Sequence, residues 1–527
     1  MELSSRASAS VTGSALAPAA GGRAASRGPV LLLTSVAFFM VSLDALVVVT
    51  ALPSIHRSVG GAVGTLEWAV NAYGLTFAAG IITAAALGER LGRRRVYVAG
   101  LAVFTLASAA CAVAPDAGLL ITARAVQGLG SAAVTPLALT ILAAAFPVQR
   151  RGAVVGIFGG ISGLAVAGGP LVGGAVTQGL DWHWIFWINV PIGALAVLGS
   201  LLCLPAARPG GNAGAADCGS AAEPLDVPGA VLVAAGAALV AWGLVRAGGS
   251  GWGDTSGLAG LLAGLAVLAG FVAWERRAAS PMLPLRLFSS RTFAAANVAG
   301  FMSFGAIMSA AFLTAQYFQF GLGYSPVTAG LRLLPWTATP TLVAPAAGAL
   351  ADRIGTRPLL VTGLTLQAGG LAWVSLLAPA GASGYGRYVL PFVIAGVGIS
   401  MTIPTVPTAA LGAVPAADVG RASGVANTMQ RFGGAFGIAL VSAVFAAHGH
   451  LGSAASFTTG YRPAMLGSAG LSLAGALVST GIARRRAAAG TRANVVAETD
   501  KVPISLSRSY SSSHDDSRDS RITQGSA

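Results

Sequence analysis

The feature that most constrains this chain is a series of long apolar runs that recurs from one end to the other. A helix needs about 20 apolar residues to cross the hydrocarbon core of a bilayer. We expect spanning helices at 29–51, 66–87, 95–114, 118–146, 153–177, 185–204, 227–246, 257–275, 293–317, 327–350, 358–379, 387–413, 422–447 and 463–483. These fourteen runs predict an all-α polytopic membrane protein.

Composition excludes a soluble or a disordered chain. Of the 527 residues, 54% are hydrophobic and only 9% are charged, whereas soluble domains carry roughly 25% charged residues. Disorder requires low hydrophobicity and high charge. The net charge of +14 comes largely from arginines, and runs such as Arg93-Arg94-Arg95 adjoin apolar segments. This placement is typical of anchoring at a membrane surface, so no nucleic-acid partner is expected.

The arginines also predict an orientation. Outside the two tails, loops after even-numbered helices carry fourteen arginines, and loops after odd-numbered helices carry only Arg57, Arg246, Arg387 and Arg462. Cytoplasmic loops are enriched in basic residues, so both termini are predicted to lie in the cytoplasm. Lys501 is the only lysine and Ala and Gly are abundant. This composition favours the cell membrane of a GC-rich bacterium such as an actinobacterium.

An internal repeat divides the chain. LGERLGRRR at 87–95 resembles GALADRIGTR at 348–357, and Glu89 and Asp352 are 263 residues apart (352 − 89). Eight predicted helices separate them, two more than two directly joined six-helix halves would give. Repeated halves around a central cavity are typical of secondary transporters. We expect six-helix halves at 29–204 and 293–483, two inserted helices at 226–276, a cytoplasmic loop at 205–225, a linker at 277–292, and disordered cytoplasmic tails at 1–28 and 484–527.

Two charged residues inside the predicted helices are candidates for chemistry. Asp44 is the only acidic residue well inside a predicted helix, and Arg124 lies within the fourth. A carboxylate inside a bilayer is costly and is rarely present without a function. Burial favours its protonated form and a nearby cation favours its charged form, so such a group can bind and release a proton. The alternative is a structural aspartate that is hydrogen-bonded near a helix end.

Several segments resemble the major facilitator superfamily, and in particular its fourteen-span drug:proton antiporters. The loop after the second helix has the family's acid-Arg-x-Gly-Arg pattern. The other matching segments are SLDALVVVTALP at 42–53, LITARAVQGLGSA at 120–132, AVAGGPLVGG at 165–174, WHWIFWINVPIG at 182–193, AGLRLLPW at 329–336 and NTMQRFGGAFGIAL at 427–440. The resemblance covers roughly residues 30–480.

The resemblance implies a proton-coupled exporter of drug-like or antibiotic molecules that works by alternating access. A proton gradient would take the place of a cofactor, and no enzymatic activity is expected. The implied partners are a small amphipathic molecule, protons and the bilayer, with the chain acting as a monomer. The alternatives are an exporter of an endogenous metabolite, siderophore or amino acid, and a non-transporting membrane sensor or enzyme. An enzyme would need a cluster of His, Asp or Glu within the membrane, which the predicted helices lack.

The resemblance also assigns residues. It places Asp44 and Arg124 in proton coupling, although Arg124 could instead be tied to backbone carbonyls and Gln127. It implies a conformational latch, or simple topology anchoring for some of the arginines, at Glu89, Arg90, Gly92, Arg93, Arg94, Asp352, Arg353 and Gly355. It implies an antiporter motif, which generic helix packing would also explain, at Gly169, Pro170, Gly173 and Gly174.

Amide, aromatic and basic side chains within apolar helices suit a large amphipathic substrate. The resulting candidates for the substrate cavity are Asn71, Tyr73, Gln127, Gln316, Gln319 and Arg431. For Arg431, packing with Asn427 is an equally good interpretation.

Overall fold

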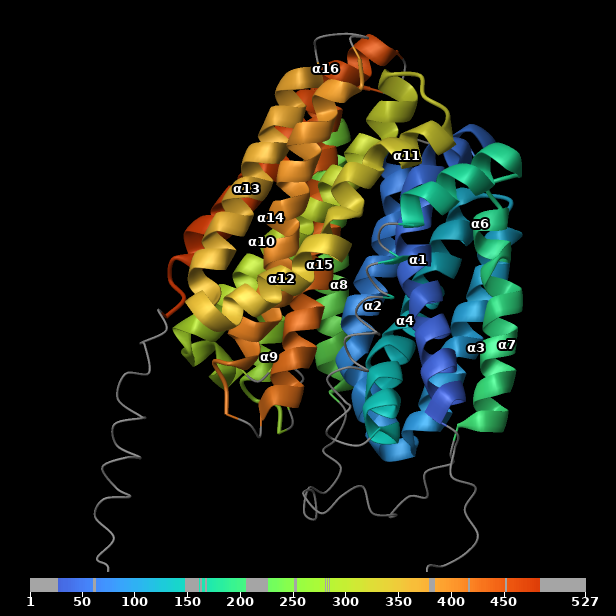
Figure 1. Cartoon of the computed structure of the whole chain (residues 1–527), viewed down its shortest axis with the longest axis vertical. Coiled ribbons are helices and arrows are strands. Elements are labelled where there is room, and N and C mark those ends of the chain that lie inside the picture. The colour runs from blue at the N-terminus through green and yellow to red at the C-terminus, as the bar shows by residue number, and fades with distance from the viewer. Residues whose placement is uncertain are drawn as a thin grey trace, which may run out of the picture. The chain divides into compact units, whose positions relative to one another are not determined.

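The chain folds into packed helices, as seen in a computed structural model (Figure 1). The structure describes residues 27–483 with gaps at 60–62, 147–160, 162–163, 166–167, 205–225, 251–253, 280, 282, 284, 379–383, 416–417 and 451–452. Every regular element among these residues is helical. The predicted loop at 205–225 and the predicted tail at 484–527 lie outside the described residues. So does the tail at 1–28, except that Arg27 and Gly28 already belong to the first helix.

The helices follow the predicted order. The N-terminal half contains α1 (Arg27–Val59), α2 (Val63–Leu91), α3 (Arg93–Ala112), α4 (Ala117–Ala145), a helical stretch at 168–179, α6 (Trp184–Trp187) and α7 (Asn189–Cys203). The inserted pair is α8 (Val227–Ser250) and α9 (Thr255–Glu275). The C-terminal half contains η1 (Leu285–Ser289), α10 (Arg291–Gln316), the π-helical turn η2 (Tyr317–Gly321), α11 (Pro326–Thr337), α12 (Thr339–Ile354), α13 (Thr356–Leu377), α14 (Gly386–Leu411), α15 (Val419–His448) and α16 (Ala454–Ser479). Within the described residues, 11 helical segments are long and apolar enough to cross a membrane.

The clearest differences from the predicted spans occur at prolines. The first helix was expected to end at residue 51, but it continues through Pro53. The last helix was expected to begin at Pro463, but it begins at Ala454. Proline is tolerated inside membrane helices because neighbouring groups satisfy the backbone groups that it frees. The predicted helix at 327–350 is instead divided at Ala338, two residues before Pro340. The proline ring disfavours a continuous helix there.

Short polar side chains fix several helix starts. A helix leaves its first backbone N–H groups without partners, and a side-chain oxygen just before the helix can accept from them. Such caps are formed by Asp116, Asp254, Ser290, Ser325 and Ser453. The apolar runs therefore begin at defined residues.

The two copies of the repeated loop have the same backbone geometry. Gly92 separates α2 from α3 with φ 97°, and Gly355 separates α12 from α13 with φ 88°. Side chains other than glycine rarely adopt this region. The repeat detected in the sequence therefore corresponds to two equivalent helix–turn–helix units, one in each half.

The inserted pair packs where the two halves meet. α8 contacts both α2 of the N-terminal half and α15 of the C-terminal half, and α2 and α15 also contact each other directly (Figure 1). One apolar cluster joins Ala78 of α2, Val233 of α8, Phe271 of α9 and Phe432 of α15. α8 therefore packs against the contact between α2 and α15.

Candidate functional site: a buried ion pair beside the contact between the halves

The structure brings the two predicted coupling residues together. Asp44 lies in the middle of α1, and its carboxylate Oδ2 is 2.6 Å from Nη1 of Arg124 in α4. The exposed fractions of the two side chains are 1% and 0%. An arginine or aspartate buried alone would carry a large desolvation cost, so each residue makes the other tolerable. The partners of Asp44 thus come from other helices, and the choice between a coupling and a structural role stays a prediction.

Amide side chains complete the carboxylate's hydrogen bonds. Gln127 and Asn189 each donate a side-chain N–H to Oδ1 of Asp44 at 3.0 Å. Gln127 also accepts from Arg124 Nη1 at 2.7 Å, and Asn189 donates to Ser108 Oγ at 3.2 Å. The carboxylate is therefore held by three donors from α4 and α7.

Arg124 is enclosed on its other sides by α2 and its own helix. Its Nε donates to the carbonyl of Ala69 at 3.1 Å. Its guanidinium lies 4.2 Å from the ring centre of Tyr73, whose hydroxyl donates to Ser131 Oγ at 2.8 Å. Nη2 has no hydrogen-bond partner among the described residues. Arg124 thus pairs with Asp44 and also contacts Gln127 and a backbone carbonyl, so its contacts include those of both interpretations.

The turn of α1 that follows Asp44 packs closely against the glycine motif at 169–174. In the helical stretch 168–179, a Cβ added at Gly169 would lie 2.6 Å from Leu46 Cβ. A Cβ added at Gly173 would lie 2.7 Å from the carbonyl oxygen of Val47 and against Thr50 Oγ1. Only glycine permits this approach of the two helices. The motif is therefore a contact surface for α1.

The same stretch also touches the other half. Gly174 packs against the backbone of Pro326, and Gly330 packs against the backbone of Pro170. A further contact comes from Gln319 in η2, whose Nε2 donates to the carbonyl of Thr50 at 2.9 Å. The end of α1 beyond Asp44 is thus in contact with both the motif helix and the C-terminal half.

The latch residues are only partly described. Gly92 and Gly355 form the turns, as expected. Arg94 donates to the carbonyl of Leu201 at the end of α7, while Arg90 and Arg353 are exposed and Arg93 is half-buried. The side chains of Glu89 and Asp352 lie outside the described residues, so their pairing stays a prediction.

The cavity candidates do not form one group. Tyr73 and Gln127 belong to the surroundings of the ion pair, and Gln319 to the contact between the halves. Asn71 is buried, and neither polar atom of its side chain has a partner in the described part of the chain. Gln316 is buried and donates to the carbonyl of Phe312 at 3.1 Å. Arg431 is half-buried, with its guanidinium 4.4 Å from the ring centre of Phe77 and 5.3 Å from that of Phe304.

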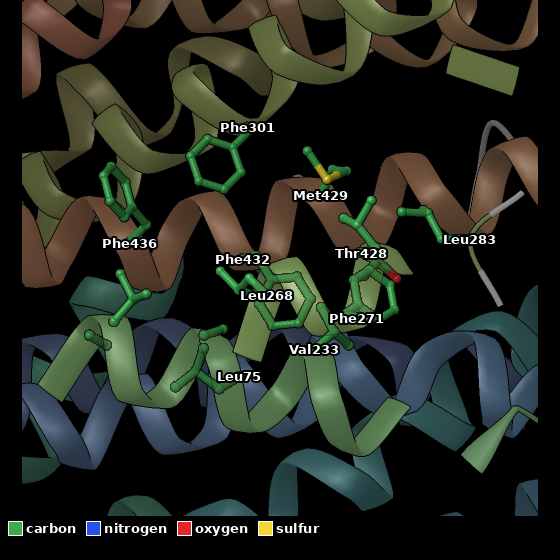
Figure 2. A pocket seen from close by; sticks show the side chains of 14 residues that line it. Leu75, Val233, Leu268, Phe271, Leu283, Phe301, Thr428, Met429, Phe432 and Phe436 are labelled. Atoms are coloured by element: carbon green, nitrogen blue, oxygen red, sulfur yellow. The ribbon is translucent and has the colours of Figure 1, made fainter. Parts of the chain in front are cut away.

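A separate apolar pocket lies beside the inserted pair. Side chains of α2, α8, α9, α10 and α15, together with Leu283, line this pocket (Figure 2), and its volume is about 260 Å³. The lining includes Leu75, Val233, Phe271, Phe301, Thr428 and Phe432. Charged side chains are absent from this lining, so the pocket is distinct from the ion-pair site.

Sequence reasoning missed two members of the ion-pair site. Asn189 and Ser108 were not among the candidates, although Asn189 lies in the family segment at 182–193. An asparagine in an apolar run was the available signal, because a buried amide needs partners. Among the residues that the structure describes, no group of three His, Cys, Asp or Glu side chains could hold a metal ion.

Comparisons with known proteins agree with this arrangement. A sequence profile of the Major Facilitator Superfamily matches residues 34–438 and 299–507. The chain is 33% identical over 418 residues to the tetracenomycin C resistance and export protein of Streptomyces glaucescens, covering 79% of this chain and 76% of that protein. It is 35% identical over 455 residues to a cephamycin export protein of Amycolatopsis lactamdurans, covering 85% of this chain and 91% of that protein.

Solved structures give the same fold. A D-xylose–proton symporter superposes with a TM-score of 0.60 at 16% identity, covering 86% of this chain and 97% of the symporter. This likeness establishes the fold, and the profile and the export proteins establish the relationship that the sequence motifs indicated. The chain therefore belongs to the Major Facilitator Superfamily and is a transporter, not an enzyme.

Proposed function

We propose that this protein exports drug-like or antibiotic molecules across the cell membrane in exchange for protons, by alternating access of its two halves. Support for the export of antibiotics comes from the relatives named for tetracenomycin C and cephamycin export. Support for proton coupling comes from a single observation: a carboxylate buried at the middle of α1 is paired with Arg124. The arginine-rich loops support an orientation with both termini in the cytoplasm.

The ion pair offers two charge states with different preferred packing. Ionised Asp44 neutralises Arg124 and accepts three hydrogen bonds. Protonation would leave a buried guanidinium without its counter-charge, which costs about 3–5 kcal/mol when such a pair is broken. Water or substrate must then reach Arg124, or the helices must move. A proton on Asp44 therefore favours a conformation other than the one in which the pair is closed.

The contacts of α1 give this change a direct route to the contact between the halves. Thr50 is six residues after Asp44 and accepts from Gln319 of the C-terminal half. In the proposed orientation these contacts lie toward the extracellular end, where they would close the cavity. Loosening of the ion pair would shift α1 against the motif helix and open that end.

The available driving force suffices for export. One proton that moves inward across 100 mV provides about 2.3 kcal/mol. Since a tenfold concentration ratio corresponds to about 1.4 kcal/mol, one proton per cycle supports a roughly 50-fold gradient of a neutral substrate. Each unit of pH difference would contribute another factor of about ten.

A susceptibility panel tests this function. The chain is expressed in a bacterial host that lacks its own efflux pumps, and growth inhibition is measured with structurally diverse antibiotics, with and without a protonophore. We expect lower susceptibility to some amphipathic antibiotics and loss of this protection when the gradient is dissipated. Unchanged susceptibility across the panel would contradict drug export, and protection that survives the protonophore would contradict proton coupling.

A further inference from the structure

Arg431 differs from Arg124 in lacking a counter-charge. No hydrogen bond or ion pair to its guanidinium is formed by the residues that the structure describes, although the side chain is half-buried in α15. Its guanidinium lies 4.4 Å from the ring centre of Phe77 and 5.3 Å from that of Phe304. Aromatic faces attract a cation but cannot neutralise it. A charge inside a membrane protein ordinarily has a partner or lines an aqueous path.

The helices around this arginine do not supply an acidic partner. α10 and α15 contain no Asp or Glu, and Asp44 is already occupied by Arg124. The acidic residues of α2, the helix that carries Phe77, are Glu67 and Glu89. They are 10 and 12 residues away from Phe77 in sequence (77 − 67 and 89 − 77). At 1.5 Å per residue these positions are roughly 15–18 Å from Phe77 along the helix.

The apolar pocket adjoins the part of α15 that carries Arg431. Thr428, Met429 and Phe432 line that pocket, and the guanidinium of Arg431 contacts rings of α2 and α10. Thr428 donates to the carbonyl of Ala78 at 3.2 Å and fixes α15 against α2. Arg431 therefore lies where α15 meets α2 and α10.

Two rings connect this position to the ion pair. Phe77 is 5.8 Å from Tyr73, ring centre to ring centre, and Tyr73 covers Arg124 at 4.2 Å. Two guanidinium groups thus face a common aromatic wall, one from each half of the protein. Only the N-terminal one is neutralised by a described residue. A ligand beside Arg431 would meet a cation, the ring of Phe304 and the neighbourhood of the proposed proton site.

We propose that Arg431 recognises an anionic group of the exported molecule, so that the substrates are aromatic amphiphiles bearing a carboxylate or an ionised phenol. This inference rests on the proposed export function. A guanidinium binds carboxylates through paired, charge-assisted hydrogen bonds, and the partly exposed ring of Phe304 provides a flat apolar surface for a substrate ring. The substrate thereby supplies the counter-charge that the described part of the protein lacks.

Binding to the purified full-length protein in lipid nanodiscs tests this assignment. The probes are three fluorescent pyrene derivatives that differ only in the headgroup: a butyrate, its methyl ester and a butylammonium. For the wild type, we expect the butyrate to bind at least about tenfold more tightly than the other two, because of the charge-assisted pair. Arg431→Gln should remove this preference and leave ester binding within about threefold. Arg431→Lys should retain part of the preference because it keeps the charge.

Arg462→Gln is the matched control, since it makes the same change at an exposed arginine of α16 and should leave all three affinities unchanged. If Arg431→Gln does not yield a monodisperse protein, the proposal is tested by the headgroup preference of the wild type and of Arg431→Lys. Equal or weaker binding of the butyrate by the wild type, or a preference that persists in Arg431→Gln, overturns the proposal, as does binding of none of the probes. The binding measurement needs no proton gradient. Its result can therefore be interpreted even if proton-driven export is not found.

Discussion

Replacing Asp44 by asparagine separates the charge of the buried pair from its shape. Asn189 and Gln127 can still donate to the remaining side-chain oxygen, as they do to Oδ1 of Asp44. The new amide nitrogen instead faces Nη1 of Arg124, where the carboxylate now accepts at 2.6 Å. Two donors would then meet, and the guanidinium would be buried without a counter-charge. We expect Asp44→Asn to cost about 3–5 kcal/mol of stability.

The double variant sharpens this expectation. Arg124→Gln alone strands the carboxylate and should cost a similar amount, about 3–5 kcal/mol. Combining it with Asp44→Asn removes both charges and leaves amide groups able to pair with one another. The double variant should therefore lose less than the sum of the single losses, with a coupling energy of about 3 kcal/mol.

Unfolding of detergent-purified protein, followed by intrinsic fluorescence, measures the cycle. Inverted vesicles measure transport of a substrate that the susceptibility panel identifies. Asp44→Asn should abolish proton-driven uptake into vesicles while retaining exchange of substrate down its own gradient. Additive stability losses would refute the mutual dependence of the two charges, and proton-driven uptake at the wild-type rate in Asp44→Asn would refute the coupling role.

Three further predictions concern glycines and a loop carboxylate. Gly173→Leu should insert into the membrane but reduce transport at least about tenfold, measured in vesicles, since the side chain would force α1 away from the motif helix. Gly92→Ala should lower the free energy of unfolding by about 1 kcal/mol because Gly92 has a positive φ. Gly74→Ala is the control and should not lower it, because Gly74 is helical with open space around it. Thermal unfolding compares the stability of both variants. Ser256 donates to Asp254 and lowers the pKa of this carboxyl below its usual value. The stabilisation that this carboxylate gives is therefore present above its usual pKa and is lost as the pH falls through its lowered pKa. Asp254→Asn should reduce this acid-dependent loss of stability, measured by unfolding at a series of pH values.

The helices were predictable because each one corresponds to a continuous apolar run in the sequence. An apolar run of sufficient length has few alternatives to a membrane span, and the acid-arginine repeat located the two equivalent turns at Gly92 and Gly355. Proline was the main source of error. Pro53 and Pro463 lie inside helices while Pro340 follows a break, and the difference depends on neighbouring helices that local sequence does not record.

The candidate site was predictable by residue type and not by arrangement. A lone aspartate and a lone arginine within apolar runs each require a partner, so both were found. Their pairing joins positions 80 residues apart, and no local pattern contains that contact. Gln127 and Tyr73 were assigned to the substrate cavity because their chemistry fits it equally well. Only the packing shows that they also contact the ion pair.

The position of Asp44 within α1 determines how a proton could control the two halves. Thr50, which accepts from Gln319 of the C-terminal half, follows it by six residues (50 − 44), or about 9 Å along a helix. Over this distance a helix behaves as a rigid rod, so a shift at one end appears at the other. Gly173 packs against the segment between them, which prevents that shift from being absorbed by local bending. The proposed proton site and the contact between the halves therefore lie six residues apart on one helix (50 − 44), and no longer chain of residues is needed to connect them.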